Sequence, residues 1–155
     1  MTGDKDTRMP GQRYRLGAEL GHGGIGRVVE AFDLAHEIEW EKAARGVDER
    51  LYPFGEEHDC CYSHVTGSPK GGMRPLPVGS YPADESPYGV RDLAGGAITW
   101  CLNGLEVPFR GYRALRGGSW AYAPNIAQSA FEQGNGPEST RWSFGFRLAL
   151  SLAEW

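Results

Sequence analysis

The side chains best suited to metal or redox chemistry are few, and their spacing does not match a known site. The three cysteines, Cys60, Cys61 and Cys101, are an odd number and form no Cys-x-x-Cys pair. This arrangement fits neither a disulfide framework nor a zinc site. The four histidines also lack metal-ligand spacing. We therefore expect buried or idle thiols, and no metal ion or other cofactor.

A glycine cluster near the N-terminus has the pattern of a phosphate-binding loop. Gly21 to Val28 reads GHGGIGRV and matches G-x-G-x-x-G-x-V, in which glycines let backbone N–H groups approach phosphates. With its flanking strands it resembles the nucleotide loop of bacterial serine/threonine protein kinases. That resemblance implies a strand lysine, an H-R-D catalytic loop and a D-F-G motif, and none follows here. We predict a glycine-turned hairpin over Tyr14 to Phe32, a relic or fusion scar without kinase activity.

Length and composition describe an ordinary globular domain. The chain has 155 residues, of which 40% are hydrophobic and 23% charged. The net charge of −4 gives no basic excess for binding nucleic acid or an anionic membrane. No apolar run approaches the roughly 18–20 residues that span a bilayer, and residues 1–13 contain no secretory apolar core. We expect a cytoplasmic protein with neither a nucleic-acid nor a membrane partner.

The elements that must position any site are short. The 23 glycines and 10 prolines predict many tight turns and short strands. The clearest helix is Glu37 to Arg45, ended by Gly46. Ile38, Ala43 and Ala44, with Trp40 nearby, are predicted to form its apolar face. Phe144 to Leu152 alternates well enough to form a closing strand, so the predicted class is α+β with much irregular loop.

The body of the chain contains several motifs in a fixed order. They are residues 39–46 (EWEKAARG), 51–55 (LYPFG), 77–82 (PVGSYP), 87–95 (PYGVRDLAG), 115–120 (LRGGSW) and 145–148 (GFRL). Together they resemble the formylglycine-generating enzyme family, also called the sulfatase-modifying factor family. The resemblance implies a C-type-lectin-like fold with a small twisted antiparallel sheet, one or two helices and long loops.

The predicted domain organisation follows from the two resemblances. Residues 1–13 are expected to be a disordered leader. Residues 14–34 are the segment that resembles a kinase glycine loop, and residues 35–155 are the lectin-like domain.

Two departures from the family pattern bear on activity. Catalytic members bind copper through a pair of cysteines near the C-terminus, and this chain has no cysteine after Cys101. Where such members carry an asparagine and a glutamate whose oxygens suit calcium, this chain has Gly96 and Thr99. We therefore expect no calcium or copper, no catalytic residues, and lean against an enzyme.

The segment Ala121 to Phe144 is the candidate binding surface. It mixes aromatic, amide, acidic and small residues without a hydrophobic period, a composition typical of recognition surfaces. It is similar to the variable proteins of diversity-generating retroelements, whose mutated residues lie between an R-G-G-S-W motif and a terminal G-F-R. We predict a non-catalytic module that binds an unknown protein or other macromolecular ligand. The candidate contact residues are Tyr122, Asn125, Gln128, Phe131, Glu132, Gln133, Asn135, Glu138, Ser139, Arg141 and Trp142.

Three alternatives stay open from the sequence. The segment is equally compatible with a plain polar surface loop in which ordinary drift has changed the side chains. An oxidase acting on sulfatase cysteines predicts tight Cu(I) binding and oxygen consumption. A truncated kinase-fusion remnant without independent activity would explain the abrupt change of resemblance near Leu34 to Glu37.

Overall fold

The chain forms two compact units. The computed structural model describes residues 16–23, 26–31, 35–105 and 110–149. One unit is Ala35–Arg147, and the other joins the N-terminal residues to the end of the chain. The predicted leader, residues 1–13, lies outside the described residues.

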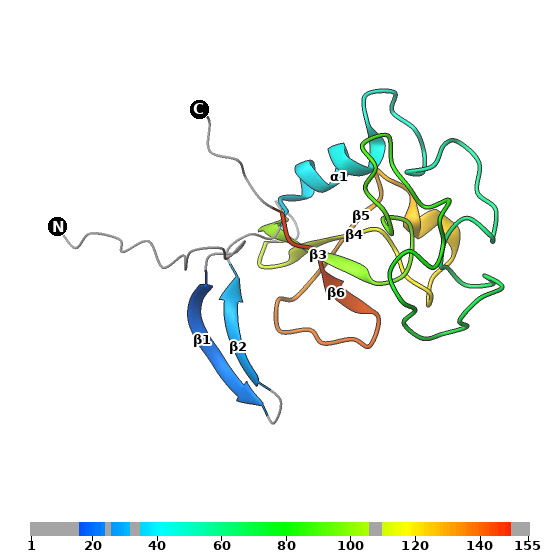
Figure 1. Cartoon of the computed structure of the whole chain (residues 1–155). Coiled ribbons are helices and arrows are strands. Elements are labelled where there is room, and N and C mark those ends of the chain that lie inside the picture. Colours follow the sequence, from blue (N-terminus) through cyan, green and yellow to red (C-terminus); the bar gives the residue numbers. More distant parts are fainter. Residues whose placement is uncertain (1–15, 24–25, 32–34, 106–109, 150–155) are drawn as a thin grey trace. The chain divides into compact units, whose positions relative to one another are not determined.

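The N-terminal unit contains a β-hairpin. Strand β1, Leu16–Gly23, pairs antiparallel with β2, Gly26–Ala31, and Gly23 lies opposite Gly26 at the turn end (Figure 1). The glycine-turned hairpin predicted from the sequence is therefore confirmed over these two strands. The ends of the predicted span, residues 14–15 and 32, and the turn residues 24–25 are outside the described residues.

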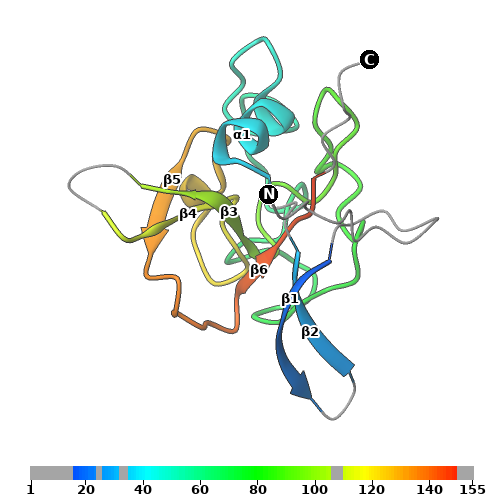
Figure 2. The ribbon, with the colours of Figure 1, turned by 90° about the vertical axis from the view of Figure 1, so that its left-hand side faces the viewer.

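The larger unit is built on a small four-stranded sheet. Its elements are α1 (Glu37–Arg45), β3 (Ile98–Gly104), β4 (Arg113–Arg116), a 3₁₀ helix η1 (Pro124–Ala127), β5 (Glu132–Asn135) and β6 (Phe144–Phe146). The strand order is β5-β4-β3-β6, as Figures 1 and 2 show. The β3–β4 and β4–β5 pairs are antiparallel, whereas β3 and β6 are parallel. The predicted α+β class is confirmed, but the sheet is mixed rather than antiparallel, because the chain returns to the sheet edge through a long loop.

Helix α1 has the predicted bounds, Glu37–Arg45, and ends at Gly46 with a positive φ of 71°. Its N-terminus is a capping box: the His36 side chain accepts the Ile38 N–H, and Glu39 accepts the His36 N–H. Trp40 and Ala44 are buried, as predicted. The prediction for Ile38 was wrong, since this side chain is 65% exposed. Residues two apart on a helix point to opposite sides, so Ile38 cannot share the face of Trp40.

The predicted closing strand is shorter than its alternating pattern indicated. Strand β6 ends at Phe146, and residues 150–152 are outside the described part of the chain. Arg147 follows β6 directly, and its guanidinium donates to two loop carbonyls, Arg91 O at 2.8 Å and Asp92 O at 3.0 Å. Its side chain is therefore engaged with a distant loop, a contact that the alternating pattern does not show.

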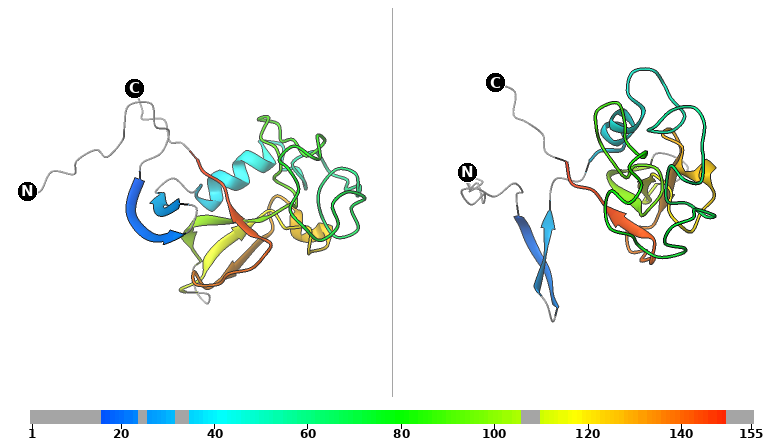
Figure 3. Two further views of the ribbon diagram at one scale, coloured as in Figure 1. Left: turned by 60° about the horizontal axis from the view of Figure 1, so that its bottom comes forward. Right: turned by 45° about the vertical axis from the view of Figure 1, so that its right-hand side comes forward.

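Residues 46–97 contain no helix or named strand. These loops gather with η1 at one end of the sheet (Figures 1 and 3). Backbone hydrogen bonds connect them: Gly95 N–H to Gly117 O (2.5 Å), Gly96 N–H to His64 O (2.8 Å) and Trp120 N–H to Gly96 O (3.1 Å). A small apolar cluster of Val65, Ala94 and Ala127 lies among them. Their order therefore depends on tertiary hydrogen bonds rather than on local secondary structure.

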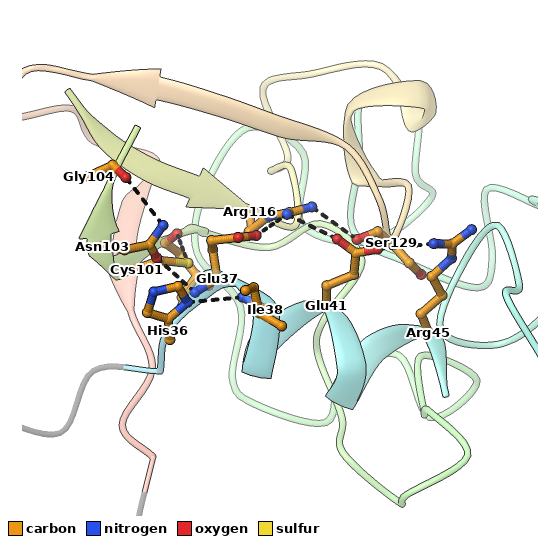
Figure 4. Close-up of polar contacts among 11 residues, drawn as sticks. His36, Glu37, Ile38, Glu41, Arg45, Cys101, Asn103, Gly104, Arg116 and Ser129 are labelled. Atoms are coloured by element: carbon orange, nitrogen blue, oxygen red, sulfur yellow. Dashed lines mark hydrogen bonds and ion pairs between the residues drawn. The ribbon is translucent and has the colours of Figure 1, made fainter. Parts of the chain in front are cut away.

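A buried guanidinium joins the helix to the sheet. Arg116, at the end of β4, is 4% exposed and forms ion pairs with Glu37 and Glu41 of α1, the latter at 3.0 Å. Figure 4 shows both carboxylates pointing from α1 to Arg116, with Ser129 beyond the guanidinium. Arg116 Nη1 also lies 3.5 Å from the Ser129 carbonyl oxygen. One side chain thus connects α1, β4 and the chain that follows η1.

Replacing Arg116 with alanine is expected to destabilise the fold by about 3 kcal/mol, because two carboxylates lose their buried partner. The glutamates keep some access to water, which places the loss at the low end of values for buried pairs. Arg91→Ala is the matched control, since Arg91 pairs with Glu85 at the surface and its loss is expected to cost under about 1 kcal/mol. Urea unfolding measures both, and equal losses would contradict the structural role of Arg116.

Two neighbouring glycines provide a test of the backbone contacts. Both have a positive φ, 94° at Gly95 and 68° at Gly96. A Cβ at Gly95 would lie 2.3 Å from His64 O, whereas one at Gly96 would meet nothing within 4 Å. Gly96→Ala is expected to cost about 1–2 kcal/mol from backbone strain, and Gly95→Ala a further 1–3 kcal/mol or so from overpacking. Thermal unfolding of the two variants measures the difference, and a Gly95→Ala variant as stable as Gly96→Ala would disprove the close approach.

Candidate functional site

The candidate surface, residues 121–144, contains exposed and half-buried side chains on one continuous stretch of chain. It includes η1 and β5 and ends at the first residue of β6. The exposed candidates are Asn125, Glu132, Glu138, Arg141 and Trp142. The half-buried candidates are Tyr122, Gln128, Phe131, Gln133, Asn135 and Ser139. Five of the predicted contact residues are therefore freely accessible, and six offer only part of their surface.

The first half of this surface is fixed through its backbone. The Thr66 N–H donates to Tyr122 O at 2.9 Å, and the Ser129 N–H donates to Leu51 O at 2.8 Å. Between these two points Ala127 is fully buried in the apolar cluster. It also packs against Gly118, where an added Cβ would come within 3.0 Å of it. The exposed side chain of Asn125 thus lies on a backbone that is hydrogen-bonded to other loops before and after it.

The second half is fixed by the sheet and by a polar turn. Strand β5 pairs with β4, which places Glu132 opposite Arg116 and Gln133 opposite Leu115. The Asn135 side chain accepts the Gly136 N–H (3.0 Å) and the Ser139 hydroxyl (2.8 Å). Asn135 and Ser139 therefore stabilise the turn after β5, a role that no pattern in the sequence indicated.

Aromatic residues form the end of the surface nearest β6. Trp142 is 58% exposed, and its ring lies 5.7 Å from that of Trp120, which is 4% exposed. The Arg141 guanidinium lies over the Phe144 ring at 5.8 Å. An exposed tryptophan supported by a buried one is a rigid apolar contact with a low entropic cost of binding.

A pocket of about 370 Å³ lies beside this surface, and no sequence motif indicated it. Its lining includes Asp84, Asp92, Trp120 and Arg147. The charged groups are engaged in holding the wall together: Asp84 accepts the Ala94 N–H (2.9 Å), Asp92 accepts the Gly79 N–H (2.8 Å), and Arg147 donates to carbonyls. Thr99 and Gly96, the positions without calcium donors, also line it. Asp92 lies inside the motif 87–95 and Asp84 just before it. Their positions in the sequence do not indicate a pocket, which becomes visible only in the fold.

The electrostatics of the pocket wall are set by burial. Burial raises the pKa of Asp84 to about 7, and the nearby Asp92 carboxylate adds to the rise. Burial also lowers the pKa of Arg147, although both carboxylates oppose that shift. Asp84 therefore exchanges its proton close to neutral pH.

The three cysteines differ in accessibility. Cys101 is buried in β3, and burial raises the pKa of its thiol to about 12, so it is unreactive. Cys60 and Cys61 are exposed. Together with Asp59 they are the one group of three or more potential metal ligands found within the described parts of the chain. Cysteine spacing alone missed this group, because the third donor is a carboxylate; Asp59 beside the pair was the available signal.

The fold and the fixed loops define the class of protein: an α+β module of the C-type-lectin-like type. Residues 11–152 match the family described as the sulfatase-modifying factor enzyme 1-like domain, so the chain belongs to that family. The formylglycine-generating enzyme resemblance is thereby confirmed. The match also extends over the β1–β2 hairpin.

Two groups of curated relatives are similar to the chain. The hercynine oxygenase of Mycobacterium tuberculosis is 36% identical over 141 residues, covering 77% of this chain and 32% of that protein. The serine/threonine-protein kinase pkn1 of Chlamydia caviae is 34% identical over 136 residues, covering 77% of this chain and 21% of the kinase. The chain thus spans about a third or less of the length of these relatives.

Solved structures share the fold. Treponema denticola variable protein 1 superimposes with a TM-score of 0.66 at 24% identity, over 79% of this chain and 48% of that one. PvdO from Pseudomonas aeruginosa gives a TM-score of 0.65 at 23% identity, over 77% and 52%. Across the described residues, the longest helices fall short of the length and apolarity that crossing a membrane requires.

The raised pKa of Asp84 predicts a dependence of stability on pH. The folded protein holds this proton more tightly than the unfolded chain, whose carboxyl has a pKa of 3.8. The resulting stabilisation is complete below about pH 4 and is lost as the pH rises through about 7. Since each pKa unit corresponds to about 1.4 kcal/mol, the loss is at most roughly 4 kcal/mol. Urea unfolding between these pH values is expected to show a shallower decline for Asp84→Asn, and identical declines would refute this assignment.

Proposed function

We propose that the protein is a non-catalytic ligand-binding module whose binding surface is residues 121–144. The observation that carries the proposal is a contrast along the chain. Ala114 to Trp120 are all buried, whereas the following segment exposes Asn125, Glu132, Glu138, Arg141 and Trp142. A rigid base beneath accessible, chemically varied side chains allows those side chains to change without loss of the fold.

The chemistry of the surface suits a protein or other macromolecular partner. Trp142 supplies a large apolar contact, and Arg141 supplies a guanidinium beside it; tryptophan and arginine are frequent at the centre of interfaces. Glu132 and Glu138 give the rest of the surface an acidic character. Four further candidates are half-buried, so a partner would contact only part of each side chain: Tyr122, Gln128, Phe131 and Gln133.

The finer part of the proposal is that retroelement mutagenesis diversifies this surface. The fold shared with Treponema denticola variable protein 1 supports it, because that protein is itself a variable protein. Deep sequencing of the coding region in a population of the source organism is the decisive experiment. We expect substitutions concentrated at the exposed codons of 121–144. The codons of 114–120 and 145–147 are the internal control, and a uniform sequence at both would reject diversification.

The accessible tryptophan is expected to be dispensable for folding. Trp142→Ala loses one aromatic contact, with an expected cost of about 1 kcal/mol. Its matched control is Trp120→Ala, which empties a buried site and is expected to cost about 3–5 kcal/mol. Thermal and urea unfolding measure both variants. Equal losses would make Trp142 part of the core and remove the principal contact from the proposed surface.

A second candidate is an enzyme that uses oxygen. The similarity to hercynine oxygenase of Mycobacterium tuberculosis favours it, although this chain covers 32% of that protein. Oxygen uptake can be recorded with hercynine and with a cysteine-containing peptide, while copper and other first-row metal ions are added in turn. Uptake dependent on both substrate and metal would replace the binding-module proposal, and none is expected. The kinase relatives similarly keep open a kinase-fusion remnant without activity of its own.

A further inference from the structure

The two adjacent cysteines occupy the centre of a defined turn. The Tyr62 N–H donates to Asp59 O at 2.9 Å, which makes Cys60 and Cys61 the two central residues of a β-turn. The Asp59 carboxylate accepts the Cys61 N–H at 2.7 Å, a hydrogen bond that stabilises the turn. Cys60 and Cys61 are both exposed.

The turn is anchored on both sides. Before it, the His58 ring nitrogen is 3.0 Å from the Ser63 hydroxyl, and Ser63 is fully buried. After it, the Tyr62 ring meets Phe54 edge-on at 5.4 Å, and Phe54 stacks on the buried Tyr52 at the same separation. The backbone of the turn is therefore held by the domain.

Three ligand atoms converge at this turn. The two sulfur atoms and one carboxylate oxygen of Asp59 all lie within 4.8 Å of one another. Zinc binds thiolate sulfur at about 2.3 Å and carboxylate oxygen at about 2.0–2.2 Å in tetrahedral geometry, so two donors to one ion lie about 3.5–3.8 Å apart. Small rotations of exposed side chains bring the present separations into that range.

The carboxylate also marks where a cation would lie. The two sulfur atoms and the Asp59 carboxylate oxygen share one exposed space, no more than 4.8 Å apart. A divalent cation bound there would release the two thiol protons, and its ligands would be two thiolates and one carboxylate, for a net charge of −1.

We propose that Asp59, Cys60 and Cys61 form a binding site for zinc(II). The two thiolates supply the soft ligands that select this ion over calcium or magnesium, and the carboxylate is a common third ligand. The fourth position is open to water or to a donor from a bound partner. The loop that carries the turn is hydrogen-bonded to the candidate surface at both ends, through Leu51 and Thr66.

The test is a zinc titration of the full chain against a chromophoric chelator, with the thiols kept reduced by a phosphine. We expect one zinc ion per chain in the unmodified protein. The Cys60→Ser/Cys61→Ser double variant is expected to lose at least about 100-fold in affinity, and Asp59→Asn about 10-fold. Cys101→Ala is the matched control, because that buried thiol is outside the site; its affinity is expected to be unchanged.

Two further measurements separate a built site from ordinary thiol chemistry. Cobalt(II) in place of zinc is expected to give a thiolate-to-metal absorption band that is absent from the double variant. A free peptide of residues 56–64 is expected to bind zinc at least about 10-fold more weakly, because it lacks the anchored turn. Circular dichroism checks that the exposed substitutions leave the fold intact. Unchanged zinc binding in the double variant, or equal affinity of peptide and protein, would overturn the proposal.

Discussion

The ion pairs and hydrogen bond of Arg116 connect three parts of the domain: α1, the end of β4, and the chain between η1 and β5. The guanidinium is almost fully buried at the end of β4, and its partners are two glutamates one turn apart on α1. A buried charge is tolerable only when it is paired, so the helix must lie where Glu37 and Glu41 can reach it. The contact with Ser129 O extends this requirement to the start of the chain that leads into β5. The position of the candidate surface thus depends on an interaction beneath it.

Close backbone contacts perform the role that long secondary elements have in other domains. Gly95 lies against His64 O, and Gly117 lies against Leu93 O and the Trp40 ring. Such approaches are open only to glycine at these positive φ angles. They let loops satisfy each other's backbone groups, which explains how residues 46–97 form a defined structure without a helix or named strand. These contacts form the base on which residues 121–144 lie.

The proposed surface and the turn that carries Cys60 and Cys61 are connected by hydrogen bonds of the same loop. The loop from Leu51 to Thr66 is bonded at both ends to the 121–144 segment and carries Asp59, Cys60 and Cys61 between. Its aromatic residues anchor the turn to the same apolar cluster that holds η1, through Phe54. A ligand at one site would therefore lie on elements that position the other. The pocket beside Trp120 differs, because its charged groups are already used to hold its wall.

The sequence by itself determined the family, the α+β class, the hairpin and the bounds of α1. These follow from ordered motifs, glycine positions and helix-ending signals, all of which are local. The composition of residues 121–144 differs from the motifs on either side, and their role as a binding surface stays a prediction. The sequence could not decide that β6 pairs parallel to β3, or that Asn135 and Ser139 stabilise the turn after β5. Nor could it place Asp84 and Arg147 in the wall of one pocket. Those facts depend on contacts between residues distant in the chain or on side-chain directions, and only tertiary packing fixes them.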